Sequence, residues 1–308
     1  MAAVELSSCP TELPTVLRAR AEFTIMTVAS RSTWTAPSVE RAVAAAAALL
    51  AGPYIADRDF RLVTREPGSV RRDLPIWEST PGVVRFDADG WGPVQRDDVP
   101  DVPGAFVLSN ILSSSECEQL LGLSSAMGWT EDAPVSLGRQ IRQNENCVWI
   151  ADHSLWEPIW ARLAPHMPVD PERGAPVGLN QRWRLYRYDG ANEDVFRMHT
   201  DGDWPGSAVV DGKLVRDAFG DRWSQLTLLL YLDDDYGGGE TTFFVPHGAG
   251  ARSGDLRSVR VPRGGALAFW HGEHPLSLLH EGSPVTRGVK TIVRSDVLYM
   301  VPGATCPA

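Results

Sequence analysis

The sequence predicts a mainly β fold with flanking helices (α+β), of the β-sandwich or jelly-roll kind. Its 308 residues include 11 Trp, 28 Gly and 23 Pro, a composition that favours strands and loops over long helices. Helix signals come early in the chain, and short apolar segments separated by turns rich in Gly and Asp recur in its second half. Chains with this order of elements pack as a sandwich or jelly roll with helices beside it.

Residues 1–100 are expected to form an N-terminal region of unknown role that is partly helical. A Thr/Ser-Pro signal opens a predicted helix over 35–50, and short strands ended by turns are predicted within 60–69 and 82–90. The segment RDDVPDVPG at 96–104 is rich in Pro and Asp, so it marks the predicted domain boundary.

The second domain is expected over 101–308. Its first part, 105–129, predicts a strand, a serine cap around 113–115 and then an amphipathic helix. Strand candidates separated by turns follow. They are 147–150, 182–188, 225–232, 241–245, 258–261, 266–270 and 290–300.

Composition excludes several classes of protein. With 39 acidic residues against 29 Lys and Arg, the formal charge of -10 opposes attraction to a phosphate backbone, so nucleic acid is not an expected partner. Four well-separated cysteines form no C-x-x-C pair, which argues against a zinc knuckle and fits a reducing compartment. No apolar run approaches the roughly 20 residues that span a bilayer. The first residues lack the basic-then-apolar order of a secretory signal, so a cytoplasmic protein is expected; the oligomeric state stays open.

A candidate metal site begins in FRMHTDGDW, residues 196–204. His199 and Asp201 are two positions apart on a predicted strand end, so an imidazole nitrogen and a carboxylate oxygen point to the same side. The third ligand is sought among four later histidines, and His280 is favoured because it follows an alternating apolar run. The other three are His247 and, in the predicted turn HGEHP, His271 and His274, which are expected at the surface or in a supporting role.

Two histidines and a carboxylate make the facial triad that holds non-haem Fe(II) and leaves three coordination positions open. Open positions suit a bidentate 2-oxo acid and dioxygen. A 2-oxo diacid also needs a cation for its second carboxylate, and Lys290 lies ten residues after His280 at the start of the last predicted strand. Arg294 has the same facing parity on that strand and is the rival anchor, because arginine binds carboxylates bidentately.

Four ordered segments of the chain resemble the prolyl 4-hydroxylase-like family of Fe(II)/2-oxoglutarate dioxygenases. They are HTD at 199–201, LTLLLYLDDDYGGGETTFF at 226–244, VPRGGALAFW at 261–270 and LLHEGSPVTRGVK at 278–290. The helix segment ILSSSECEQLLGL resembles the one that precedes the catalytic core of that family, so the resemblance covers about 105–301. It implies a double-stranded β-helix, or jelly-roll, core.

The resemblance also implies roles for single residues. His199, Asp201 and His280 would bind Fe(II), and Lys290 would bind the distal carboxylate of 2-oxoglutarate. Thr227 would add a hydroxyl contact to the cosubstrate. A tyrosine would add a second one, and Tyr188 is preferred over Tyr186 because it precedes the glycine turn YDG. Dioxygen is the second cosubstrate, and ascorbate is a possible reductant.

The expected reaction is hydroxylation of a C–H bond, foremost in a peptidyl, prolyl-type residue, with release of succinate and CO2. The alternatives are the same chemistry on a free amino acid or small metabolite, and a sensor that binds metal or 2-oxoglutarate without turnover. The segment 202–224 follows two ligands and has no predicted regular structure, which makes it a candidate substrate loop. Trp204, Trp223 and Arg216 are its candidate substrate contacts, with Arg222 beside them.

Overall fold

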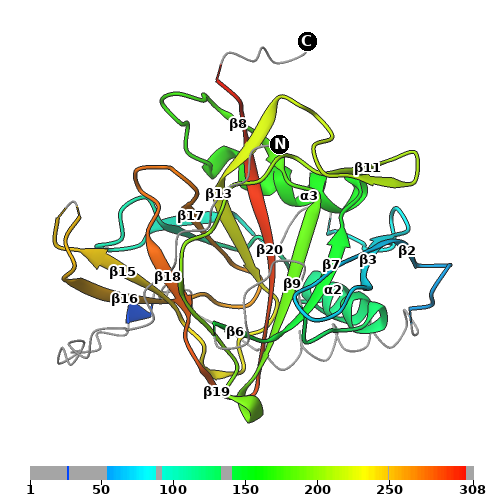
Figure 1. Ribbon diagram of the computed structural model, residues 1–308, viewed down its shortest axis with the longest axis horizontal. Helices are drawn as coiled ribbons and strands as arrows, with labels where there is room; N and C mark the ends of the chain where they lie inside the picture. Colours follow the sequence, from blue (N-terminus) through cyan, green and yellow to red (C-terminus); the bar gives the residue numbers. More distant parts are fainter. Residues whose placement is uncertain (1–25, 28–53, 88–91, 133–140, 249, 303–308) are drawn as a thin grey trace.

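The computed structural model describes residues 26–27, 54–87, 92–132, 141–248 and 250–302. Two β-sheets face each other in this structure, with helices on the outside of the larger one (Figure 1). The helix predicted over 35–50 lies outside the described residues. No helix within the described ranges is long and apolar enough to cross a membrane.

The larger sheet has ten strands in the order β2-β3-β7-β9-β20-β13-β17-β5-β4, and β8 pairs with β20 off this path. The central strand β20 is shown in red in Figure 1. The strands are β2 (Phe60–Glu66), β3 (Leu74–Ser79), β4 (Gln95–Asp98), β5 (Phe106–Ser109), β7 (Glu145–Ile150), β8 (Pro176–Leu179), β9 (Arg182–Asp189), β13 (Arg222–Tyr231), β17 (Ala266–Trp270) and β20 (Val289–Met300).

The smaller sheet has six strands in the order β1-β16-β15-β18-β10-β6. They are β1 (Met26–Thr27), β6 (Arg142–Gln143), β10 (Val195–His199), β15 (Thr241–Pro246), β16 (Gly254–Arg260) and β18 (Leu279–Gly282). Two further two-stranded sheets pair β11 (Ala208–Val210) with β12 (Lys213–Val215), and β14 (Gly237–Gly238) with β19 (Val285–Arg287).

The strand order identifies a jelly roll. From β9 onward the chain passes back and forth between the sheets, so that β9, β20, β13 and β17 are neighbours in the larger sheet. Their counterparts β10, β18, β15 and β16 are neighbours in the smaller sheet. Eight antiparallel strands wound in this way over two sheets form a double-stranded β-helix. The mainly β fold with flanking helices and a jelly-roll core is thereby confirmed.

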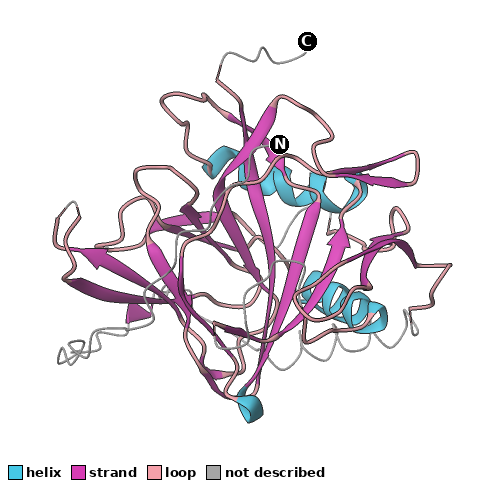
Figure 2. Cartoon of the chain, viewed as in Figure 1, coloured by secondary structure: helices cyan, strands magenta, loops and turns pink. Residues whose placement is uncertain are grey.

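Helices α2 (Ser114–Met127) and α3 (His153–Leu163) cover the outer face of the larger sheet (Figure 2). Within the described residues there are also two short 3-10 turns, η1 (Ala164–His166) and η2 (Gly190–Asn192). The predicted serine cap is present, because Ser113 accepts from the Glu116 backbone while the Glu116 side chain accepts from the Ser113 backbone. Helix α3 was not predicted, since Pro158 lies inside it and interrupts the helix signal.

The described part of the N-terminal region belongs to the larger sheet. Strand β2 lies within the predicted segment 60–69 and pairs with β3, which in turn runs parallel to β7. The strand predicted within 82–90 is wrong for its described part, because residues 82–87 form turns and bends. The segment 74–79 is a strand instead, although Pro75 obscured its pattern.

Candidate metal centre

Two histidines of the smaller sheet lie opposite each other across a pair of antiparallel strands. His199 is the last residue of β10 and His280 lies in β18, and the two are direct partners in the register of these strands. A β-bulge between Phe196 and His199 shifts the strand just before the histidine and turns its side chain toward the partner strand. Their imidazole rings have centroids 4.4 Å apart.

Backbone carbonyls fix the orientation of both rings. The Nδ1 of His199 is 2.7 Å from the carbonyl oxygen of Arg197, and the Nδ1 of His280 is 3.1 Å from that of Leu278. A hydrogen on each Nδ1 satisfies these carbonyls, so each Nε2 keeps its lone pair for another partner. This arrangement is typical of histidines that bind a metal through Nε2.

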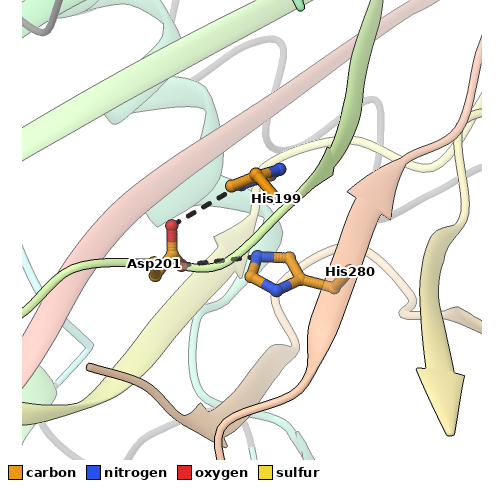
Figure 3. Close-up of side chains that lie close together, drawn as sticks. All are labelled: His199, Asp201 and His280. Carbon is orange, nitrogen blue, oxygen red and sulfur yellow. Dashed lines mark ion pairs between the residues drawn. The ribbon is translucent and has the colours of Figure 1, made fainter. Parts of the chain in front are cut away.

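Asp201 completes the cluster, as Figure 3 shows. Its Oδ1 is 3.6 Å from the Nε2 of His199, and its Oδ2 is 3.5 Å from the Nε2 of His280. The three potential ligand atoms all lie within 4.8 Å of one another. These distances leave space for one ion between three donors, and the sequence-predicted set His199, Asp201 and His280 is brought together.

The carboxylate of Asp201 is held in place by the larger sheet. Arg294 donates from Nη1 to Oδ1 at 2.6 Å, and Thr227 donates from its hydroxyl to Oδ2 at 2.8 Å. Burial alone raises the pKa of Asp201, but the charge of Arg294 and the hydrogen bonds to His199 and His280 hold it well below its ordinary value. Asp201 is therefore ionised, as a metal ligand must be.

A chain of buried hydrogen bonds continues behind this carboxylate. Thr227 donates to Asp201, so its oxygen accepts from the Nδ1 of His271 at 2.7 Å. The Nε2 of His271 then accepts from the hydroxyl of Ser224 at 2.9 Å, and that hydroxyl accepts from the backbone N–H of Trp204. This series of hydrogen bonds thus leads back to the loop that carries Asp201. His271 was expected either at the surface or in a supporting role. It is buried and supports the site.

A pocket with about 360 Å³ of empty space, part of it open to solvent, begins at this cluster and runs between the sheets. Its lining includes all three residues of the cluster and also residues that the sequence did not single out. These further residues are Phe196, Leu229, Thr241, Gly282 and Ile292. Apolar side chains dominate among them, so the pocket pairs an apolar wall with a few polar groups, as small-molecule sites do.

Lys290 also lines this pocket. Its side chain is almost fully buried, and its ammonium donates to the carbonyl oxygen of Gly239 at 2.6 Å. Burial lowers the pKa of Lys290 to about 8, against the opposing effect of Asp233 and Glu240. A buried ammonium next to an open pocket is suited to bind an anion.

The two candidate tyrosines lie at different positions along the pocket. Tyr188 is the direct partner of Lys290 between β9 and β20, and the ammonium lies 5.4 Å from its ring centroid. Tyr186 lies one row further toward Arg294. Thr227 is placed differently from the expectation, since its hydroxyl is used by Asp201 and His271. The hydroxyl of Thr241 lines the pocket instead, bonded to Tyr231.

The segment 202–224 is not an irregular loop, because it contains the antiparallel strands β11 and β12. Trp204 stays near the site, with its ring 5.4 Å from the guanidinium carbon of Arg184. Trp223 is the register partner of Tyr299, whose side chain belongs to the hydrophobic core between the larger sheet and helices α2 and α3, so Trp223 is not brought to the metal cluster. Arg216 is 73% exposed in its side chain and pairs with Glu66.

Three other predicted residues are also placed by the structure. Arg222 pairs with its neighbour Asp221. His247 is exposed and lies 3.2 Å from Asp255, and His274 stacks on Trp270, so neither joins the metal cluster.

No protein-family model matches the chain, and no curated protein sequence matches it. Among solved structures, the chain is similar to a viral collagen prolyl hydroxylase from Paramecium Bursaria Chlorella virus-1 in complex with 2OG, at 19% identity and a TM-score of 0.38, over 68% of this chain and 98% of the other. It is similar to a Pseudomonas putida prolyl-4-hydroxylase at 15% identity and a TM-score of 0.39, over 63% and 92%. A prolyl hydroxylase from Trichoplax adhaerens, solved with a hypoxia inducible factor peptide fragment, matches at 16% identity and a TM-score of 0.41, over 65% and 84%. The assignment of the fold therefore rests on the strand order, and that of the site on its geometry.

Proposed function

We propose that this protein is an Fe(II)- and 2-oxoglutarate-dependent dioxygenase that hydroxylates a C–H bond of its substrate. The observation that carries the proposal is the position of two features in one pocket. A His-Asp-His cluster that can hold a metal and a buried lysine both line it. A dicarboxylic cosubstrate that binds the metal at one end needs a cation at the other.

The residues present fit Fe(II). Two imidazole nitrogens and one ionised carboxylate are the donor set of the facial triad, and here they lie within 4.8 Å of one another. The described cluster has no fourth protein ligand, which leaves positions for 2-oxoglutarate and dioxygen. Bound together, these groups supply oxidative decarboxylation to succinate and CO2 coupled to insertion of oxygen into a C–H bond.

The chain's own residues orient the reactants and exclude water. Arg294 and Thr227 hold the Asp201 carboxylate so that one geometry of the triad is favoured. Lys290 and Tyr188 would bind the distal carboxylate, and Leu229 and Ile292 contribute apolar lining to the same pocket. An apolar lining strengthens the attraction between Lys290 and a carboxylate, because little water screens it.

Iron-dependent release of succinate from 2-oxoglutarate tests the proposal. The wild-type protein should release succinate with Fe(II), ascorbate and 2-oxoglutarate, slowly without substrate and faster with it. His280→Ala should abolish the release. His247→Ala is the matched control, because this exposed histidine lies outside the cluster and its removal should leave the rate unchanged. Wild-type rates in His280→Ala at limiting iron would reject the assignment of this ligand.

The same experiment separates the enzyme from a sensor. A protein that only binds metal and 2-oxoglutarate gives a calorimetric signal for both but releases no succinate with any candidate substrate. Mass spectrometry of candidate peptides and metabolites, searched for a gain of about 16 Da, identifies the substrate. Both substrate classes, a peptidyl, prolyl-type residue and a free amino acid or small metabolite, stay predictions for this experiment to decide.

A further inference from the structure

A buried arginine lies beside the metal cluster on the inner face of the larger sheet. Arg184 of β9 is the direct register partner of Arg294 in β20, and Arg294 contacts Asp201. Only 11% of the Arg184 side chain is exposed. The ring of Trp204, which follows Asp201 by three residues, lies 5.4 Å from its guanidinium carbon. Arg184 is therefore enclosed between the sheet and the loop that leaves the metal cluster.

The guanidinium of Arg184 has too few partners for a buried charge. Among the described residues its ion pair is with Asp296, at 3.5 Å from Nη2 to Oδ2, which is longer than a strong charge-assisted hydrogen bond. Its Nε is buried without a hydrogen-bond partner in the same part of the chain. Arginine carries five N–H donors, so most of its binding capacity is unused.

Two neighbours that line the pocket show the same deficit. The Nε of Arg294 and the hydroxyl of Tyr186 are both buried and lack a hydrogen-bond partner among the described residues. Arg294 is directly opposite Arg184, and Tyr186 is two residues along the same strand. Buried polar groups in proteins are nearly always paired, so three unpaired donors on adjacent positions indicate that a ligand supplies the acceptor.

The charges at this position indicate an anionic ligand. Asp296 is shared, since its Oδ1 lies 3.4 Å from Arg294 and its Oδ2 faces Arg184. The second carboxylate near Arg294 is Asp201, and a metal ion would take its charge. The guanidinium groups of Arg184 and Arg294 then share the single negative charge of Asp296. One positive charge is left over, and the carboxylate of a ligand would balance it.

This position is separate from the one assigned to 2-oxoglutarate. Lys290 and Arg294 are four residues apart on β20, which corresponds to about 13 Å along a strand. Tyr188 lies in the row of Lys290, whereas Arg184 lies in the row of Arg294. A carboxylate bound at Lys290 therefore leaves the donors of Arg184 unfilled.

We propose that the substrate of this protein carries a carboxylate, and that Arg184 binds it together with the hydroxyl of Tyr186, beneath Trp204. The proposal rests on the proposed function above and narrows its substrate class. The carboxylate belongs either to a free amino acid or similar small acid, or to the last residue of a peptide. A prolyl residue inside a peptide does not offer it.

Titration with matched acids and amides tests this proposal. The full-length protein is first loaded with Zn(II) in place of iron, and then with enough 2-oxoglutarate to saturate one binding site per protein molecule. Calorimetry verifies both binding steps. The probes are L-alanine, N-acetyl-Ala-Ala-Ala with a free carboxylate, and the same peptide as its C-terminal amide. Binding is followed by calorimetry and by tryptophan fluorescence, because Trp204 lies next to the site.

At least one of the two acids should bind saturably, and the amide should not. Saturation by L-alanine alone assigns the site to small acids, and saturation by the peptide acid alone assigns it to chain ends. Arg184→Met should weaken the binding acid at least about tenfold, because it removes the charged partner while keeping the length of the side chain. Arg184→Lys should recover part of the affinity through charge without the planar fork.

Arg187→Met is the matched control, because Arg187 is on the same strand, pairs with Glu145 and should not affect probe binding. Equal binding of acid and amide, or no saturation by either acid at the highest soluble concentration, would overturn the proposal. So would unchanged acid binding in Arg184→Met. A protein that fails to bind Zn(II) or 2-oxoglutarate in the first step would instead contradict the proposed function, so the two failures are distinguishable.

Discussion

Replacing Lys290 with methionine should have opposite effects on stability and on cosubstrate binding. Burial lowers the pKa of this lysine from 10.5 to about 8, so its charged form carries a penalty of about 3 kcal/mol at neutral pH in the absence of ligand. A cation with a lowered pKa destabilises the fold below pH 8, and the penalty is relieved as pH rises from about 8 to 10.5. Methionine removes the penalty but leaves the Gly239 carbonyl without its donor, which costs about 1 kcal/mol. The free energy of unfolding at pH 7 should therefore rise by about 2 kcal/mol.

The affinity for 2-oxoglutarate should fall in the same variant. Loss of a desolvated charge partner costs about 2–5 kcal/mol, which is at least about thirtyfold in Kd. In the wild-type protein, Kd should increase up to about tenfold for each pH unit above 8, because the lysine must be protonated to bind the carboxylate. The variant should lose this dependence on pH.

Calorimetry with Zn(II)-loaded protein between pH 6.5 and 9.5 measures the affinity, and urea unfolding measures the stability. Arg294→Met tests the rival anchor under the same conditions. If Lys290→Met left Kd within a factor of about three while Arg294→Met raised it more than tenfold, the anchor assignment would be wrong. A variant that is also less stable than the wild type would refute the reasoning from burial.

Three further predictions concern the surroundings of the metal. Asp201→Ala should lower the melting temperature of the metal-free protein more than His199→Ala does, because the buried Arg294 loses its 2.6 Å partner and keeps only the longer contact to Asp296, a loss of up to about 3–5 kcal/mol; equal melting temperatures would contradict this. His271→Phe should weaken Zn(II) binding about 10- to 100-fold, because Thr227 loses the donor that orients it toward Asp201. Competition with a chelator measures the Kd for Zn(II), and an unchanged Kd would show that His271 does not support the site. Arg216→Ala should leave hydroxylation unaffected and change stability by less than about 1 kcal/mol, because this side chain is exposed; a loss of coupled turnover measured as succinate release would restore it as a substrate contact.

Much of the fold was predictable because its strands have local signals. The apolar stretches of β13, β17 and β20 are buried on both faces, and this produces the uninterrupted hydrophobic runs from which they were predicted. Helix α2 was predictable from its capping box at Ser113. Helix α3 and strand β3 were not, since a proline in each weakens the local pattern and tertiary packing decides the outcome.

The candidate metal cluster was predictable from spacing, but the residues that hold it in place were not. His199 and Asp201 are close in the sequence, and His280 follows an alternating run that places it on a strand. The hydrogen-bonded chain through Thr227 and His271 joins residues 44 positions apart, and only the pairing of β13 with β17 brings them together. Arg184 gave no signal either, because its unused donors become evident only when its neighbours are known.

Glu66 links the described part of residues 1–100 to the jelly-roll domain. This buried carboxylate ends β2 and pairs with both Arg182, at the start of β9, and Arg216, in the segment after the metal ligands. A fragment that started at residue 101 would leave Arg182 charged and buried without its counter-ion, at a cost of about 3–5 kcal/mol. It would also free the segment that carries Arg216. The shortest fragment worth expressing therefore retains β2 and starts before Phe60.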